Sequence, residues 1–237
     1  MLRYTRKEQK QAAKNDLKGK WGVSIGSYLM ATYVPMNVVM LPAVFLVFAG
    51  AFFGIAGNDI LGFSMVSVSY LLLFVPLFMV CGPLYMGYYL FNLRIARGDA
   101  VGWALPYRCF TDGVYGRLTK GYFMWTLIIL LWSMLLFVPG IIKGLSYAQM
   151  PYLMMDHPEM TWREAMKESA RMMHGHKWDL FVLGMSFFGW FVLAYFTSYI
   201  SMVYSGPYMY QALANFYRDL KGETLNVASA VTYDMPR

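Results

Sequence analysis

Apolar residues occupy most of the chain in six long segments, and polar residues are confined to the short stretches between them. About twenty apolar residues in a helix cross the hydrocarbon core of a bilayer, and each segment comes close to that length or exceeds it. The pattern therefore predicts an all-α membrane protein with about six transmembrane helices, in a membrane domain over residues 21–217. The segments are 21–49, 63–93, 121–138, 140–156, 178–197 and 199–217.

The third and fourth segments meet at Val138-Pro139-Gly140. Proline removes a helical hydrogen bond and Pro-Gly pairs mark turns, while a single helix over 121–156 would be far too long for a bilayer. We therefore predict a tight reversal here, with Pro151 kinking the returning helix near its inner end. The six helices then form three hairpins. The alternative is one kinked helix that continues into the cytosol.

Basic residues lie in four polar stretches: 1–20, 94–120, 157–177 and 218–237. With three hairpins, all four fall on one side of the membrane, and of the 20 Lys and Arg residues only Lys143 is left near an outer turn. Lys and Arg are enriched in cytoplasmic loops. The pattern predicts a basic cytoplasmic helix over 1–20, cytoplasmic loops at 94–120 and 157–177, and a cytoplasmic tail over 218–237. Both termini are then cytoplasmic.

Two polar stretches have the pattern of amphipathic interfacial helices. Thr161 and Glu164 form a capping box, and apolar and charged residues then alternate at a helical period. A helix of this kind lies in the membrane interface. Thr5 and Glu8 form a second capping box, followed by a stripe of lysines that faces either an anionic leaflet or water. The residues expected to contact the inner leaflet are Trp162, Met166, Met173 and Trp178.

The composition supports a membrane location. The chain is 58% hydrophobic and 14% charged, whereas about 25% of the residues of an average soluble domain are charged. Its net charge of +7 does not come from a basic cluster interleaved with aromatic residues, as a nucleic-acid site would require. We expect membrane lipids of the anionic inner leaflet as partners, and no nucleic acid.

One stretch, FVPGIIKGLSYAQMPYLMMDHPEMTWREAMKESARMMHGHKWDLFVLGMSFFGW, contains several distinctive short motifs. Together with the end of the chain, these are Pro139-Gly140-Ile141, Ser146-Tyr147, Pro151-Tyr152, Met173 to Trp178, Ser186-Phe187, Gly189-Trp190, Pro207-Tyr208 and Phe216-Tyr217. Over nearly its full length the chain resembles the integral-membrane family known as domain of unknown function 975. That family typically has glycine in the last outer turn, where this chain has Thr197-Ser198-Tyr199. The resemblance implies a multi-pass protein of the cytoplasmic membrane of a Gram-positive bacterium, and it implies no particular activity.

Two further stretches resemble each other: GPLYMGYYLFNLRIARGD at 82–99 and GPYMYQALANFYRDLKGE at 206–223. In both, Gly-Pro lies roughly 16 Å of helix before the first inner arginine, near the middle of the bilayer. Corresponding interrupted helices in two halves indicate a transporter-like binding site, although Gly-Pro pairs also serve close helix packing. The candidate ligand-binding residues are Gly82, Pro83, Asn92, Gly206, Pro207, Gln211 and Asn215.

The sequence contains no motif of a known hydrolase, phosphate-binding or dinucleotide-binding site, and no acidic residue lies in the interior of a predicted span. His174 and His176 lie at a helix end, where capping explains them better than a metal site. We therefore expect no catalytic residue, cofactor or metal, and a protein that is not an enzyme. Two functions remain. One is a module that handles or translocates a small or lipid-like ligand, and the other is a scaffold or regulatory subunit that recruits a partner, such as another membrane protein, through its cytoplasmic surface helices.

Overall fold

The computed structural model describes residues 2–135, 137–197 and 199–227. Helix makes up 78% of it, with no strand among those residues, so the predicted all-α class is confirmed. Within these ranges, three helices are long and apolar enough to cross a membrane: Trp21–Ile55, Tyr115–Leu135 and Lys177–Phe196. Residues 228–237, which make up half of the predicted tail, lie outside the described residues.

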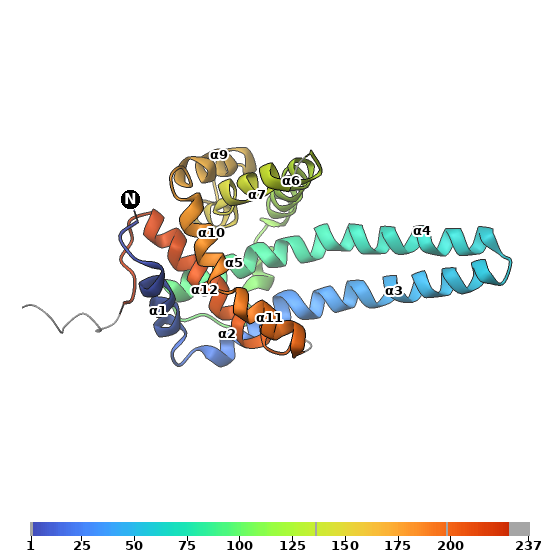
Figure 1. Cartoon of the computed structure of the whole chain (residues 1–237), viewed down its shortest axis with the longest axis horizontal. Coiled ribbons are helices and arrows are strands. Elements are labelled where there is room, and N and C mark those ends of the chain that lie inside the picture. The colour runs from blue at the N-terminus through green and yellow to red at the C-terminus, as the bar shows by residue number, and fades with distance from the viewer. Residues whose placement is uncertain (1, 136, 198, 228–237) are drawn as a thin grey trace, which may run out of the picture.

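The first two apolar segments form a long hairpin (Figure 1). Its helices α3 and α4 lie side by side and project beyond the rest of the molecule. The far end exposes large apolar side chains, among them Phe48 at 72%, Ile55 at 90% and Ile60 at 86%. A contiguous surface of this kind requires an apolar environment such as lipid. The elements are α2 (Trp21–Tyr28), the π-helical η1 (Leu29–Tyr33), α3 (Val34–Ile55), α4 (Asp59–Pro76), the π-helical η2 (Leu77–Cys81) and α5 (Gly82–Ala96).

The middle segments form two antiparallel helices, α6 (Tyr115–Leu135) and α7 (Phe137–Ser146). The indole Nε1 of Trp125 donates to the Tyr147 carbonyl at 3.1 Å, and the Lys143 amine lies 4.8 Å from the Trp132 ring centroid. These pairs exclude a single helix over both segments. However, the predicted break at Val138-Pro139-Gly140 is misplaced, because these residues lie inside the first turns of α7, where proline is tolerated.

The chain leaves the helix again between α7 and α8 (Met150–Asp156), just before Pro151. The last part comprises α10 (Lys177–Met185), α11 (Phe188–Phe196) and α12 (Met202–Leu220). The predicted outer turn at 197–199 falls between α11 and α12. There Tyr199 has a positive φ of 65°, while position 198 lies outside the described residues.

Helices α5, α8 and α12, called the return helices below, pack together at the centre, with α5 between the other two. Tyrosine rings fill their interfaces: the centroids of Tyr89 and Tyr152 are 4.8 Å apart, and those of Tyr152 and Tyr217 are 5.2 Å apart. Each return helix is also covered by one short element. α1 (Arg6–Leu17) covers α12, the 3-10 helix η3 (Leu105–Phe110) covers α5, and α9 (Trp162–Met172) covers α8.

Both predicted capping boxes are confirmed, since Thr5 with Glu8 begins α1 and Thr161 with Glu164 begins α9. The apolar face of α9, however, packs onto the protein. Met166 is 6% exposed and Met173 is fully buried, so neither side chain has much surface left for lipid. The prediction erred for these two residues because an amphipathic pattern indicates an apolar neighbour without distinguishing protein from membrane. Trp162 is half-buried and Trp178 is 70% exposed.

Candidate functional site

The two Gly-Pro pairs do not interrupt their helices as predicted. Pro83 lies at the start of α5, directly after the π-helical turn η2, and Pro207 lies inside the continuous helix α12. Both glycines allow close packing instead. A Cβ at Gly82 would lie 2.5 Å from Cδ1 of Tyr122, and one at Gly206 would overlap the ring of Tyr28. The tyrosines therefore occupy the space that an interrupted helix would have offered to a ligand.

The predicted polar residues Asn92, Gln211 and Asn215 lie at a similar height along the packed helices α5 and α12. α5 and α12 run parallel, since the rings of Tyr88 and Tyr210 are 5.1 Å apart and Arg218 of α12 donates to the Ala96 carbonyl of α5 at 2.5 Å. This register sets Asn92 beside the Gln211 to Asn215 turn of α12. All three amide side chains are fully buried.

Asp16 of α1 accepts hydrogen bonds from two of these amides. Gln211 Nε2 and Asn215 Nδ2 donate to its Oδ2 at 3.2 and 2.9 Å. Burial of Asp16 raises the pKa of its carboxyl above the ordinary value, against the opposing effect of these two donors. The sequence analysis missed Asp16 because it belongs to a helix assigned to the cytoplasm, 199 residues from Asn215.

Two of the buried amides retain an oxygen without a donor. Asn92 Nδ2 donates to the Tyr88 carbonyl at 2.7 Å, but neither Asn92 Oδ1 nor Gln211 Oε1 has a partner among the described residues. Buried acceptors without a donor are uncommon in native proteins and call for a water, an ion or a ligand.

A third buried amide with an unpaired oxygen lines a separate pocket of about 200 Å³. Gln149, at the junction of α7 and α8, is 1% exposed and its Oε1 has no donor among the described residues. Its backbone N–H donates to Ser169 Oγ of α9 at 3.1 Å, and that hydroxyl donates to the Ser146 carbonyl at 2.9 Å. The remaining lining residues are Tyr89, Trp125, Ile129, Gly144, Ala148, Tyr152, Leu180 and Leu213.

Sequence reasoning did not find this pocket, although a signal existed. Gln149 is the only amide side chain in the apolar segment 140–156. A buried polar residue in such a segment must be paired or must serve a ligand. The residues around Gln149 come from α5, α6, α9, α10 and α12 as well, and no local sequence pattern brings these helices together.

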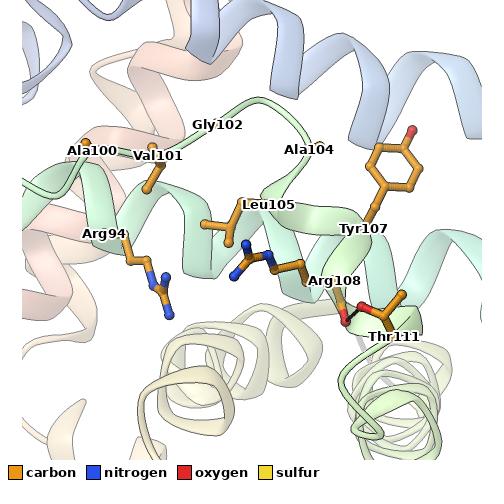
Figure 2. Close-up of a pocket in the computed structure, with 9 residues that line it drawn as sticks. All are labelled: Arg94, Ala100, Val101, Gly102, Ala104, Leu105, Tyr107, Arg108 and Thr111. Carbon is orange, nitrogen blue, oxygen red and sulfur yellow. Dashed lines mark hydrogen bonds between the residues drawn. The ribbon is translucent and has the colours of Figure 1, made fainter.

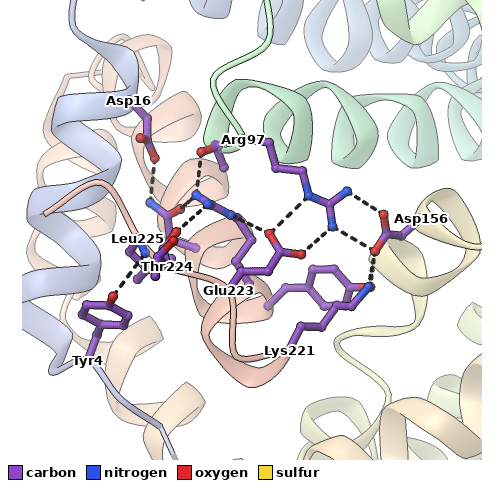
Figure 3. Close-up of polar contacts among 12 residues, drawn as sticks. Tyr4, Asp16, Arg97, Asp156, Lys221, Glu223, Thr224 and Leu225 are labelled. Carbon is purple, nitrogen blue, oxygen red and sulfur yellow. Dashed lines mark hydrogen bonds and ion pairs between the residues drawn. The ribbon is translucent and has the colours of Figure 1, made fainter.

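An ion-pair network joins the C-terminal ends of the three return helices, α5, α8 and α12 (Figure 3). Arg97, which follows α5, binds Asp156 of α8 through two nitrogens at 2.6 and 3.0 Å and Glu223 through two at 2.6 and 3.2 Å. Lys221 reaches Asp156 at 2.6 Å, and Arg218 reaches Glu223 at 2.9 Å. Burial disfavours the charged form of Asp156, but the hydrogen bonds from Arg97 and Lys221 outweigh it and hold the pKa of that carboxyl well below its ordinary value.

The comparisons with known proteins bear on this arrangement. The family described as Protein of unknown function (DUF975) matches residues 58–224. The match contains both Gly-Pro pairs, Gln149 and every member of the ion-pair network, and it leaves α1 with Asp16 outside. No curated protein and no solved structure matches the chain. Because the match covers well over half of the sequence, the chain belongs to the DUF975 family.

Proposed function

We propose that this chain is a multi-pass protein of the bacterial cytoplasmic membrane that handles a small lipid-like ligand and carries out no chemical reaction. In this proposal three helical hairpins cross the bilayer and both termini lie in the cytoplasm. The distribution of lysine and arginine supports the orientation. Apolar side chains exposed at the far ends of the helices support the crossing: Met134 at 77%, Phe196 at 78% and Ile200 at 73%, in addition to those of the first hairpin.

The pocket at Gln149 carries the ligand proposal. Its walls are mainly aromatic and aliphatic, and the unpaired Gln149 Oε1 supplies one hydrogen-bond acceptor. Ligand pockets typically combine apolar walls with a few placed polar groups. The matching ligand is an apolar molecule with a hydroxyl donor, such as an acylglycerol.

The test compares a monoacylglycerol with the methyl ester of the same fatty acid, which lacks the hydroxyl groups. In detergent, the monoacylglycerol should raise the thermal unfolding midpoint of the wild type more than the ester does. Gln149→Leu should abolish that difference, because the acceptor is lost while the pocket stays apolar. Gln11→Leu is the matched control, since Gln11 is an exposed amide on α1. Equal shifts from both compounds in the wild type, or a difference that persists in Gln149→Leu, would refute the ligand proposal.

A second candidate function, a scaffold that recruits a partner at the inner face, is favoured by the ion-pair network. Arg97 and Asp156 fix the ends of α5 and α8 relative to Glu223 after α12, which gives a rigid platform. A scaffold should retain a co-purifying protein that is lost in Arg97→Gln, and its unfolding midpoint should not respond to either lipid.

A further inference from the structure

A basic pocket of about 390 Å³ lies where the inner end of α5 meets the loop that leads into η3 (Figure 2). Arg94 of α5 and Arg108 of η3 extend their guanidinium groups into the same space. No acidic residue lines the pocket, and neither arginine side chain has an ion pair or hydrogen bond among the described residues. The other lining residues are Ala100, Val101, Gly102, Ala104, Leu105, Tyr107 and Thr111.

Two arginines that converge without a carboxylate form a site for an anion. Guanidinium groups bind phosphate oxygens with paired, charge-assisted hydrogen bonds. Elsewhere on the same inner side, Arg97 and Arg218 are both neutralised by carboxylates. Arg94 and Arg108 therefore differ from their neighbours in having positive charge available to a ligand.

An apolar groove of about 330 Å³ adjoins the basic pocket, and Tyr107 lines both. The tyrosine is fixed in place because its hydroxyl donates to the Met30 carbonyl at 2.8 Å. The rest of the groove comes from α3, η2, α5 and η3, with hardly a polar atom on its surface. Its other lining residues are Pro35, Val38, Val39, Pro42, Val80, Leu84 and Phe110.

The separation of the two sites matches the dimensions of one lipid leaflet. Arg94 and Leu84 are both on α5, ten residues apart, which is about 15 Å along a helix. Half of the hydrocarbon core of a bilayer is also about 15 Å thick. If a phosphate lies at Arg94, the groove at Leu84 lies at the depth of the acyl chains.

We propose that these two pockets bind one phospholipid of the inner leaflet. Its phosphate lies between Arg94 and Arg108, and an acyl chain lies in the groove beside Val38 and Val80. The site is separate from the pocket at Gln149 and does not depend on the function proposed for it.

The experiment measures affinity from thermal unfolding midpoints of the full chain in detergent, titrated with three probes. Phosphatidylglycerol carries both phosphate and chains, diacylglycerol carries chains alone, and inorganic phosphate carries no chain. Phosphatidylglycerol should bind at least tenfold more tightly than either of the others. Inorganic phosphate binding as tightly would reduce the site to a simple anion pocket, and diacylglycerol binding as tightly would remove any role for the arginines; either result overturns the proposal.

Two double variants and a control test the location. Arg94→Gln with Arg108→Gln should lower the phosphatidylglycerol affinity at least tenfold. Val38→Trp with Val80→Trp fills the groove from two exposed positions. This double variant should lower the affinity for phosphatidylglycerol but leave the affinity for inorganic phosphate unchanged. Arg6→Gln with Lys18→Gln removes the same charge from exposed positions of the N-terminal region and should change nothing.

All four replaced side chains in the two double variants are exposed, so their midpoints without lipid should equal that of the wild type. Native mass spectrometry of the folded proteins supplies a second measurement, the number of phosphatidylglycerol molecules retained. Unchanged affinity and retention in the double arginine variant would overturn the proposal.

Discussion

The return helices α5 and α12 both contain a Gly-Pro pair, at the start of α5 and inside α12, and they pack in parallel, yet they are covered in different ways. Five residues after the first glycine, α5 has Gly87 and α12 has Gln211. At Gly87 the backbone of η3 approaches so closely that a Cβ would lie 2.5 Å from the Pro106 carbonyl oxygen. At Gln211 the side chain instead donates to Asp16 of α1.

The difference shows two physical solutions for covering equivalent faces of a helix. Backbone contact at a glycine buries surface without polar groups, but it tolerates no added atom. The polar contact at Gln211 accepts larger side chains, but each buried donor then requires an acceptor. The α1 contact therefore depends on one carboxylate, and the η3 contact depends on the absence of one side chain.

Asp16→Ala should have the largest effect, lowering the free energy of unfolding by about 2–6 kcal/mol, because two buried donors lose their acceptor at about 1–3 kcal/mol each. Both donors meet the single oxygen Oδ2. Asp16→Asn can present its amide oxygen at that position and should stay close to the wild type. Chemical unfolding in detergent measures both, and similar losses in the two variants would show that charge, rather than hydrogen bonding, holds α1.

Gly87→Ala should have the next largest effect. It should lower the free energy of unfolding by about 1–3 kcal/mol, because the backbone of η3 must move to admit the methyl group. Gly206→Ala should lower the free energy of unfolding by less than Gly87→Ala does. Its methyl group would meet the outer part of the Tyr28 ring, and that side chain can shift.

Cysteine accessibility provides a local measurement for this comparison. Cys109 of η3 is 4% exposed and Cys81 is 1% exposed. Displacement of η3 in Gly87→Ala should make Cys109 reactive toward a thiol reagent while Cys81 stays protected. If Cys109 stays unreactive and stability is unchanged, the close approach at Gly87 is not a constraint.

Local features of this fold could be predicted from the sequence, and the contacts that form the sites could not. The capping boxes at Thr5 and Thr161 depend on residues three positions apart, and both are present. The sequence predicts a break at Val138-Pro139-Gly140, whereas α7 already begins at Phe137, because Pro139 can begin a helix as well as end one. Asp16 has no such local signal, because nothing near it in the sequence indicates that α12 supplies its partners.

The same reasoning explains the outcome for the candidate sites. The sequence predicts equivalent positions for the Gly82 and Gly206 pairs, but it gives no sign that the tyrosines packed on them come from other helices. Gln149 and the ion-pair network combine residues from separate helices, and only tertiary structure brings them together. The charge pattern predicts a membrane side for these residues, but it does not predict which arginines are neutralised by carboxylates.

The pH dependence of stability should separate the α1 contact from the ion-pair network. Asp16 has a raised pKa in the folded state, so its contribution is fully present below the ordinary value of 3.8 and is lost as pH rises through the folded value. Asp156 and Glu223 have lowered pKa values, so their contribution is present above the ordinary values and is lost as pH falls through the folded ones.

The unfolding midpoint of the wild type should therefore rise as pH falls through the folded pKa of Asp16, and it should decrease as pH falls below the ordinary pKa values of Asp156 and Glu223, 3.8 and 4.5. In Asp16→Asn the midpoint should no longer rise as pH falls, but it should still decrease at acidic pH. In Asp156→Asn the decrease of the midpoint at acidic pH should be smaller. A rise that persists in Asp16→Asn would assign it to another group.

The smallest effects are expected at the prolines themselves. Pro207 lies inside α12, so Pro207→Ala can restore a helical hydrogen bond worth about 0.5–1.5 kcal/mol. Pro83 lies at the start of α5 beside the π-helical turn η2, where proline costs a helix little, so Pro83→Ala should change stability by less than about 0.5 kcal/mol. If the prolines only shape helix packing, neither change should alter the midpoint shift given by the monoacylglycerol, since the Gln149 pocket has neither residue in its lining. A lost shift in Pro207→Ala, with the fold intact, would instead return the ligand site to the buried amides Asn92 and Gln211. Those amides retain unpaired oxygens at the level where α5 and α12 meet, and release of Asp16 would free the Gln211 donor as well.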